Sequence, residues 1–188
     1  MNKEEVKERE LVQMMQHDGV RGMKAFYALY SGYLTAVCMR YIPDKDDVKD
    51  VLQEGFINIY NAVARFQYKG VGSLKAWTTR IIVNEALKHL KEKEKLKTTS
   101  IFHSDIEAIE DEQEPDFDAI PPSEIIQMIQ ELPAGYRTVF NLYVFEQKSH
   151  KEIATLLGIG ENSSASQFHR AKALLVKKIN IVRANNKS

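Results

Sequence analysis

The 188-residue sequence has few of the features that stabilise small secreted domains or anchor a chain in a membrane. Cys38 is its only cysteine, which excludes an internal disulfide and a zinc site built from several cysteines. No apolar run approaches the roughly 18 residues that a membrane span needs, and the first ten residues, MNKEEVKERE, are not those of a secretory signal. We therefore expect a cytoplasmic protein with no membrane insertion of its own, in which Cys38 is a buried structural thiol on an apolar helical stripe.

The motifs that usually reveal an enzyme are missing as well. The sequence contains no GxxxxGKS phosphate loop, no GxGxxG after a strand and no HExxH helix. Its five histidines are scattered without ligand spacing. The acidic run at 44–50 matches no calcium loop and stands at an expected helix start, where acids favour the helix dipole. We expect no enzyme activity, no metal and no cofactor.

The net charge of zero hides an uneven distribution along the chain. Residues 1–97 carry 17 basic and 13 acidic side chains, residues 98–122 carry 8 acidic and no basic ones, and residues 123–188 carry 9 basic and 5 acidic ones. Two mildly basic blocks are thus joined by a strongly acidic segment. Basic blocks suit a polyanion such as DNA, because phosphate contacts release condensed counterions. An excess of this size is a weak indication when taken alone.

Apolar residues at three- and four-residue spacing predict an all-α fold. In the first block these stripes predict helices over 23–41 and 48–66, separated by Pro43, and a third helix that begins at Ser73. Asp44 or Asp46 can cap the second of these helices, and Ser73 can cap the third. The segment 67–72 holds two glycines and is predicted to be a loop. No segment shows the alternation of a strand, and no repeat is visible.

Helical spacing stops at residues 98–122, which are acidic and end in two prolines. This segment has few residues able to build a core, so it is predicted to be a flexible linker. Helical spacing resumes at Ser123 and continues through two further stripes before and after Pro133. The sequence therefore predicts two small helical domains, residues 1–97 and 123–188, joined by a flexible acidic linker.

Residues 149–175 have the layout of a DNA-binding helix-turn-helix. Ser149 and Glu152 fit a capping box, and Gly158 suits the left-handed residue that ends such a helix. The second helix offers short polar groups and donors that suit a groove, namely Ser163, Ser164, Gln167 and Arg170. A plain helical hairpin has the same apolar spacing, so this segment alone leaves both interpretations open.

Three motif groups follow one another along nearly the whole chain. The first is DVKDVLQEGF at 47–56. The second and third are Phe66 with SLKAW at 73–77, Ile81 and Asn84, and then Leu132-Pro133 and Arg137 with EIA at 152–154, Leu157-Gly158 and HRA at 169–171. In this order and spacing the groups resemble regions 2 and 4 of bacterial extracytoplasmic-function (ECF) sigma factors.

This resemblance implies a sigma factor that binds core RNA polymerase and directs promoter-specific initiation by recognising the −10 and −35 elements. In that family the first motif docks on the clamp helices of the β′ subunit, and the C-terminal domain meets the β flap. The residues expected to bind core polymerase are Asp47, Asp50, Gln53 and Glu54. Asp47, Asp50 and Glu54 are expected to share a helix face, which suits a basic protein surface. The alternative is a solvated face with a helix cap.

The loop at 66–73 and the helix after it are expected to recognise the −10 element. A base pulled from the duplex needs a replacement pocket, so aromatic and amide groups beside cations make physical sense. The candidates are Tyr68, Lys69, Trp77, Arg80, Asn84, Lys88 and Lys91. The cationic ones suit phosphate contacts that position the strand without reading it. A lone tryptophan at helical spacing is also typical of a core, so that alternative stays open for Trp77.

The second helix of the helix-turn-helix is expected to enter the −35 major groove. Gln167 can pair with adenine, and Arg170 can reach guanine or phosphate. Here the chain departs from the family's common G-T-x-K-S-R opening, because residues 162–167 read NSSASQ. Ala165 removes one expected phosphate contact, and Gln167 in place of arginine changes the expected base preference.

Four further hypotheses stay open from the sequence. A stand-alone regulator that binds an operator as a dimer is the main alternative to a sigma factor, and a protein-binding adaptor is another. The resemblance also implies an anti-sigma factor as a partner. Finally, the acidic linker either occupies positively charged channels of core polymerase until RNA displaces it or is only a soluble spacer.

Overall fold

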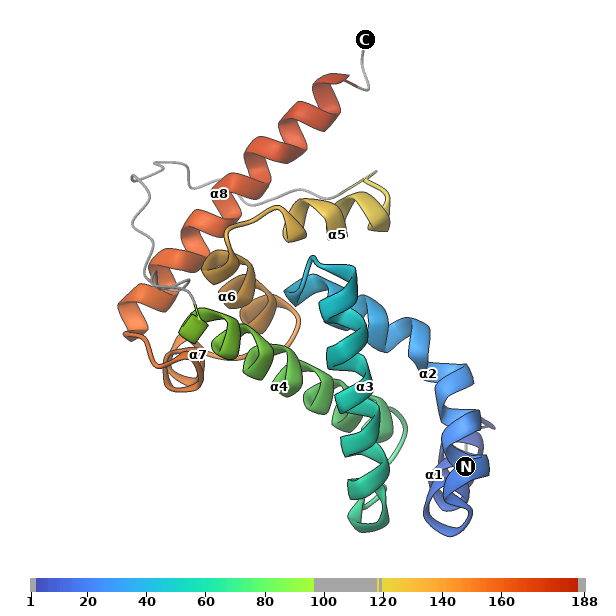
Figure 1. Ribbon diagram of the computed structural model, residues 1–188. Helices are drawn as coiled ribbons and strands as arrows, with labels where there is room; N and C mark the ends of the chain where they lie inside the picture. Colours follow the sequence, from blue (N-terminus) through green and yellow to red (C-terminus); the bar gives the residue numbers. More distant parts are fainter. Residues whose placement is uncertain (1–2, 97–117, 119, 186–188) are drawn as a thin grey trace. The chain divides into compact units, whose positions relative to one another are not determined.

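The computed structural model describes residues 3–96, 118 and 120–185, and Figure 1 shows them as helices joined by short connections. No strand occurs among these residues, so the prediction of an all-α fold is confirmed. The chain divides into two compact units, Met1–Lys93 and Glu94–Ser188, which are described separately below. Most of the predicted acidic linker lies outside the described residues; of its last residues, Pro121 and Pro122 are described, and Pro122 is the first residue of a helix.

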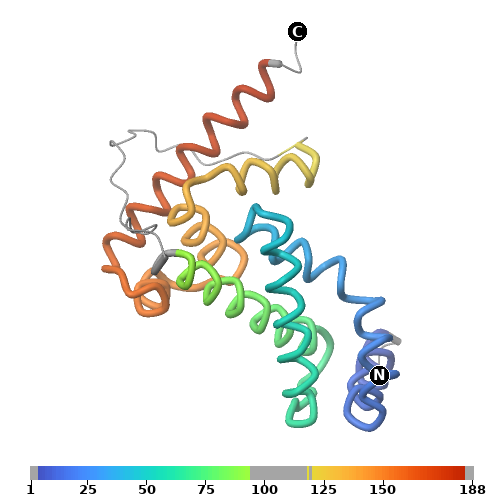
Figure 2. The backbone as a smooth tube through the Cα atoms, viewed as in Figure 1, coloured from blue at the N-terminus to red at the C-terminus, as the bar shows by residue number. Residues whose placement is uncertain are grey.

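The first unit contains α1 (Lys3–His17), α2 (Gly19–Tyr41), α3 (Lys45–Ala62), the short 3-10 helix η1 (Val63–Arg65) and α4 (Ser73–Leu96). The tube in Figure 2 follows the chain from α1 into α2 and then back along α3. Asp18 caps α2 by accepting from the Arg21 N–H at 3.3 Å. Asp44 caps α3 by accepting from the N–H groups of Asp46 and Asp47, both at 3.0 Å. Of the two acids predicted to cap this helix, Asp44 is the one that does so.

The core of the first unit lies where α2, α3 and α4 turn their apolar sides inward. The apolar side chains with no exposed surface are Phe26, Leu34, Cys38, Tyr41, Ile59, Leu74, Ile82 and Ala86. Burial raises the pKa of the Cys38 thiol to about 12, so this thiol stays protonated and unreactive near neutral pH. The prediction of a buried structural cysteine is therefore confirmed.

The second unit contains α5 (Pro122–Gln130), α6 (Ala134–Val144), α7 (His150–Leu157) and α8 (Glu161–Asn185). Its core joins α5, α6 and α8 through Ile120, Met128, Ile129, Leu132, Tyr136, Phe140, Ala171, Leu175 and Ile179. Arg137 is buried beneath the end of α5 and donates from Nη1 to the carbonyls of Gln130 at 2.8 Å and Leu132 at 2.9 Å. Burial lowers the pKa of its guanidinium to about 10, which still leaves it charged at neutral pH.

The helix-turn-helix consists of α7, a short turn and the first half of α8. The predicted capping box is present, because Ser149 Oγ accepts from the Glu152 N–H and the Glu152 carboxylate accepts from the Ser149 N–H. Gly158 ends α7 with φ 71°, the left-handed conformation that only glycine adopts without strain. Among the described residues, no helix is both long enough and apolar enough to cross a membrane.

Candidate protein and nucleic-acid interfaces

The polar side chains of α3 divide into an exposed group and one inward-turned residue. Asp50, Gln53 and Glu54 are exposed. The Asp47 side chain is only 18% exposed, because its carboxylate pairs with Lys93 and lies 3.4 Å from Nε2 of His89 on α4. The structure therefore brings three of the four predicted polymerase-binding residues onto one free surface and turns Asp47 toward its own unit.

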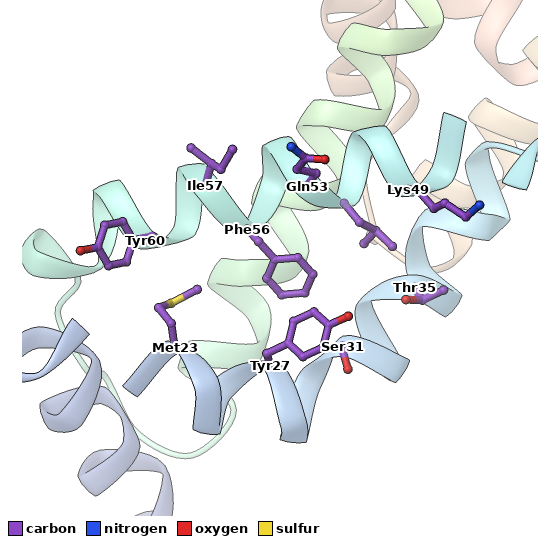
Figure 3. A pocket seen from close by; sticks show the side chains of 10 residues that line it. Met23, Tyr27, Ser31, Thr35, Lys49, Gln53, Phe56, Ile57 and Tyr60 are labelled. Atoms are coloured by element: carbon purple, nitrogen blue, oxygen red, sulfur yellow. The ribbon is translucent and has the colours of Figure 1, made fainter. Parts of the chain in front are cut away.

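An apolar groove runs between α2 and α3 beside this polar surface, with a volume of about 570 Å³. Figure 3 shows Tyr27 of α2 and Phe56 of α3 pointing toward one another across it, and their ring centres are 5.1 Å apart. Met23, Leu52, Ile57 and Tyr60 also line the groove, and Gln53 lies at the same site. Ile57 and Tyr60 are 44% and 51% exposed, so apolar side chains at this groove remain open to solvent.

Sequence reasoning missed this groove because it placed Tyr27 on the same apolar stripe as Phe26 and placed Phe56 on the apolar stripe of the next helix. Phe26 follows that expectation and has no exposed surface, whereas its neighbour Tyr27 is 57% exposed. The width of the apolar stripe on α2 could have indicated the groove. One neighbouring helix cannot cover a stripe that is wider than one helix face, so residues at its edge stay exposed.

On α4, five of the predicted −10 residues form one row along the helix. Trp77 is followed at intervals of three, four, four and three residues by Arg80, Asn84, Lys88 and Lys91, which places all five on the same face. The other four residues of this row are exposed. Lys88 Nζ lies 3.6 Å from the Glu85 carboxylate, a distance that leaves the ammonium group largely in solvent.

Trp77 is half-buried and packs on Phe66, with the ring centres 4.7 Å apart. These two rings line two hollows on the surface. One, of about 490 Å³, also carries Lys69 and Arg80, and the other, of about 540 Å³, carries Asn84. Trp77 therefore contributes to packing and also lines both hollows, and its role at the −10 element stays a prediction.

Sequence reasoning did not single out the other polar residues of these hollows. Arg65 and Gln67 line the hollow that holds Lys69, and Asn58 and Asn61 line the one that holds Asn84. Asn58 donates from Nδ2 to the Glu85 carboxylate at 2.9 Å, which ties α3 to α4 at this point. Asn58 and Asn61 lie on α3, Arg65 on η1 and Gln67 in the loop that follows. Nothing in the sequence around these residues indicates that they lie close to α4.

Tyr68 is the predicted −10 residue that the structure separates from the others. Its hydroxyl donates to the Glu5 carbonyl of α1 at 3.4 Å, and the Arg9 guanidinium lies 5.3 Å from its ring centre. Desolvation raises the pKa of the Tyr68 phenol, the nearby Glu8 and Glu5 carboxylates add to this, and Arg9 opposes it. Tyr68 lines neither hollow and faces α1 instead.

On α8 the predicted −35 residues do not lie on one surface. Ser163 is exposed, but Ser164 is completely buried, with its Oγ 3.0 Å from Nδ1 of His150. Gln167 is 7% exposed and lies on the same side of the helix as Ser164 and the core residue Ala171. Arg170 is half-buried and donates from Nη1 to the Tyr136 hydroxyl at 3.4 Å.

This arrangement divides the predicted groove-facing residues between the surface and the interior of the unit. Ser164 and Gln167 continue the inward stripe of Ala171 and Leu175 at the spacing of a helix, so they pack inside the unit and do not face outward. The exposed residues at the start of α8 are Glu161, Asn162, Ser163, Ala165, Ser166 and His169. The sequence indicates this inward orientation, because the apolar stripe of Ala171 and Leu175, continued toward the start of the helix, passes through Gln167 and Ser164.

The described residues contain no group of three or more His, Cys, Asp or Glu side chains placed to hold a metal ion. What they do offer is an acid-and-amide surface on α3, an aromatic and cationic row on α4, and a helix-turn-helix in the other unit. A helix-turn-helix within an all-helical fold is typical of transcription proteins that bind DNA.

Comparisons with known proteins give the family. The Sigma-70 region 2 family matches residues 26–96, and the Sigma-70 region 4 family matches residues 123–175. The chain belongs to the sigma-70 family and is a promoter-recognising sigma factor of the ECF type. This outcome confirms the resemblance, and a stand-alone operator-binding regulator is not favoured.

The matches to individual proteins extend over most of the chain. RNA polymerase sigma-H factor of Pseudomonas aeruginosa is 28% identical and covers 90% of this chain and 92% of its own. ECF RNA polymerase sigma-E factor of Escherichia coli is 26% identical and covers 94% and 96%. A solved structure described as CnrH in complex with the cytosolic domain of CnrY covers 92% and 97%, with 19% identity and a TM-score of 0.47.

Proposed function

We propose that the two parts of this sigma factor divide promoter recognition between them. Residues 1–97 bind core RNA polymerase and the −10 element, residues 98–122 are the tether, and residues 123–188 bind the −35 element. The observation that carries the proposal is the pairing of two surfaces on neighbouring helices, one acidic on α3 and one cationic on α4. The acidic surface on α3 suits a basic protein partner, and the cationic surface on α4 suits nucleic acid.

Core polymerase docks on α3 through Asp50, Gln53 and Glu54, and the docking element is the pair of β′ clamp helices. Exposed carboxylates attract the basic residues of a partner and set the register of docking. The adjacent groove at Tyr27 and Phe56 supplies apolar area to the same contact, since an interface needs a desolvated centre as well as a polar rim. Asp47 acts differently, by holding α4 against α3. In the second part of the chain the partner is the β flap.

The −10 element binds at the row on α4 and the hollows that Phe66 and Trp77 line. An unpaired base gains stacking energy on an aromatic face, and cations beside it hold the strand by its phosphates. Lys69 and Arg80 flank one hollow, while Lys88 and Lys91 extend the row for the strand to follow. Tyr68 takes no direct part, because its hydroxyl is bound to α1.

The −35 element binds at the exposed start of α8, through Asn162, Ser163, Ser166 and His169. Amide, hydroxyl and imidazole groups can contact base edges or phosphates in a major groove. Arg170 reaches the edge of this surface from beside Tyr136. Ser164 and Gln167 support the helix from inside and make no contact with bases.

Three expectations follow from membership of this family. The chain acts as a transcription initiation factor and not as an enzyme, and it works in the cytoplasm, where core polymerase and promoters are found. A further partner is an anti-sigma factor, which holds the chain inactive by covering its polymerase-binding surfaces.

Charge reversal on α3 tests the docking surface. The double variant Asp50→Lys, Glu54→Lys places cations where the partner is basic, so holoenzyme assembly is expected to fall at least tenfold while helicity and melting temperature stay near wild type. Glu10→Lys, an exposed charge reversal on α1, is the matched control and is expected to assemble normally. Unchanged assembly of the double variant with core polymerase would contradict the assignment.

A further inference from the structure

Glu8 on α1 is a carboxylate that reaches across the first unit to the start of α4. Its residue is only 8% exposed. Oε2 accepts from the Gly72 N–H at 2.6 Å, and Oε1 accepts from the Leu74 N–H at 2.9 Å. Both oxygens therefore bind backbone N–H groups more than sixty positions away in the chain. Desolvating a buried carboxylate costs free energy, and charge-assisted hydrogen bonds of this kind compensate for that cost.

These two bonds give α4 something that its own sequence does not supply. The first turn of α4 has no acidic residue, although an acid there favours the helix dipole. Ser73, the predicted cap, is occupied elsewhere, because its Oγ accepts from the Lys69 N–H at 3.2 Å. Glu8 therefore provides the negative charge and the acceptors for the first backbone donors of α4.

Gln16, two turns farther along α1, holds the other end of the same connection. Its Nε2 donates to the carbonyls of Val63 at 3.0 Å and Phe66 at 2.9 Å. Between these points Tyr68 is bound to the Glu5 carbonyl and to the Arg9 guanidinium. The segment from η1 to the start of α4 is thus tied to α1 at Val63, Phe66, Tyr68, Gly72 and Leu74.

We propose that α1 is a positioning element for capture of the −10 strand, with Glu8 as its principal positioning residue. This inference rests on the function proposed above for the segment around Lys69, Phe66 and Trp77. Glu8 does not touch DNA. It holds the loop in the conformation that presents Lys69 and opens the hollow beside Trp77 before DNA arrives, and this removes the ordering cost from binding.

The test uses holoenzyme assembled from the full chain and core polymerase. The probes are a fork-junction DNA with a single-stranded −10 region, taken from a promoter mapped with wild-type holoenzyme, and the same DNA with single −10 bases replaced. Glu8→Gln keeps the size of the side chain but leaves one acceptor for two N–H donors. Glu10→Gln, an exposed residue of the same helix, is the matched control.

For Glu8→Gln we expect unchanged assembly with core polymerase, about tenfold weaker binding of the fork junction, and a smaller difference between correct and replaced −10 bases. The control is expected to match wild type. Gln16→Ala removes both contacts at the other end of the loop and is expected to act in the same direction, so it decides the matter if Glu8→Gln does not fold.

The results separate the two levels of the proposal. If wild-type holoenzyme does not distinguish −10 bases on the fork junction, the proposed role of the loop is wrong. If wild type distinguishes them and both variants do so equally well, the loop binds the strand but α1 does not position it. Loss of core assembly in parallel with DNA binding in both variants would also overturn the inference, since Glu8 would then stabilise the unit as a whole.

Discussion

Neighbouring residues on one helix of this protein take different roles because a rotation of one position separates surface from core. Ser163 is exposed and Ser164 has no exposed surface, although the two have the same chemistry. On α3, Asp47 is paired within the unit while Asp50 faces solvent. Residue type thus predicts what a side chain can do, and its place on the helix decides whether it can do it.

The start of α8 provides a direct contrast between surface and interior. Replacing Ser163 or His169 with alanine removes an exposed polar group, so each is expected to weaken binding of −35 duplex by holoenzyme, by about 1–3 kcal/mol where a base contact is lost. Gln167→Ala removes an inward side chain and is expected to lower stability while the preference among −35 sequences stays the same. Competition binding with a set of −35 variants, together with thermal unfolding, measures both quantities.

A changed −35 preference in Gln167→Ala at wild-type stability would mean that Gln167 turns outward when DNA binds. The proposed groove-facing set would then be wrong.

The capping box of α7 makes a prediction about pH. Hydrogen bonds from the N–H and the hydroxyl of Ser149 lower the pKa of the Glu152 carboxyl below its ordinary value of 4.5. A lowered pKa in the folded state contributes stability above the ordinary pKa, and that stability is lost as the pH falls through the lowered value. Ser149→Ala removes the hydroxyl, so the pKa of Glu152 is expected to rise toward 4.5, with a loss of about 1 kcal/mol in stability from the missing cap.

Carbon-13 NMR titration of the full chain measures this pKa. Thr155→Ala is the control, because Thr155 Oγ1 donates to the Lys151 carbonyl within the same helix and does not meet Glu152. A Glu152 pKa that does not move in Ser149→Ala would show that the Ser149 hydroxyl does not donate to the Glu152 carboxylate in solution.

At the scale of elements, α1 is more than an extension of the chain. It packs against α2 and holds the connection between α3 and α4 through Glu8 and Gln16. The close packing of α1 and α2 depends on Gly22, because a Cβ there would meet the backbone of Met14 and Met15. Because Gly22 has no side chain, α1 can pack closely against α2. In that position α1 holds the connection between α3 and α4.

Gly22→Ala is expected to destabilise the first unit by about 1–3 kcal/mol, since backbone cannot move aside as a flexible side chain can. By shifting α1 it is also expected to weaken capture of single-stranded −10 DNA. Gly32→Ala lies in the same helix with no atom near the added Cβ, and is expected to be neutral or to stabilise by up to about 1 kcal/mol. Chemical denaturation of both variants makes the comparison, and equal stability of the two would contradict the packing described for α1 and α2.

Local signals in the sequence predict most of the helices. Spacing, Pro43 and the Asp44 cap predict α3, and the capping box and Gly158 predict α7. The contacts of Glu8, Tyr68 and Asn58 join residues far apart in the chain and leave no local trace, so they could not be predicted. Ser164 and Gln167 lie on the inward stripe of α8, and polar residues there resemble surface residues when residue type alone is considered.

At the scale of the whole molecule, the distribution of charge along the chain is the dominant feature. Residues 98–122 carry 8 acidic side chains and no basic one, between two blocks that each have an excess of basic residues. An acidic segment resembles nucleic acid electrostatically and is attracted to the same positively charged channels of core polymerase. We hypothesise that it occupies such a channel until RNA displaces it.

Replacing the eight acids of this segment with Asn and Gln removes that attraction without changing its length. Open-complex formation and the ratio of abortive to full-length RNA are both expected to change. A spacer of mixed sequence, equal length and equal negative charge is the control and is expected to behave as wild type. Unchanged initiation by the neutral variant would reduce the segment to a tether.

The central claim is that this chain selects promoters only as part of RNA polymerase, by reading two separate elements. Transcription from fragmented genomic DNA with purified chain and core polymerase, followed by mapping of start sites, tests it most directly. We predict starts that require both components and that share one sequence block near −10 and another near −35. Starts that share no such blocks, or specific binding of the same DNA by the chain without core polymerase, would contradict the claim.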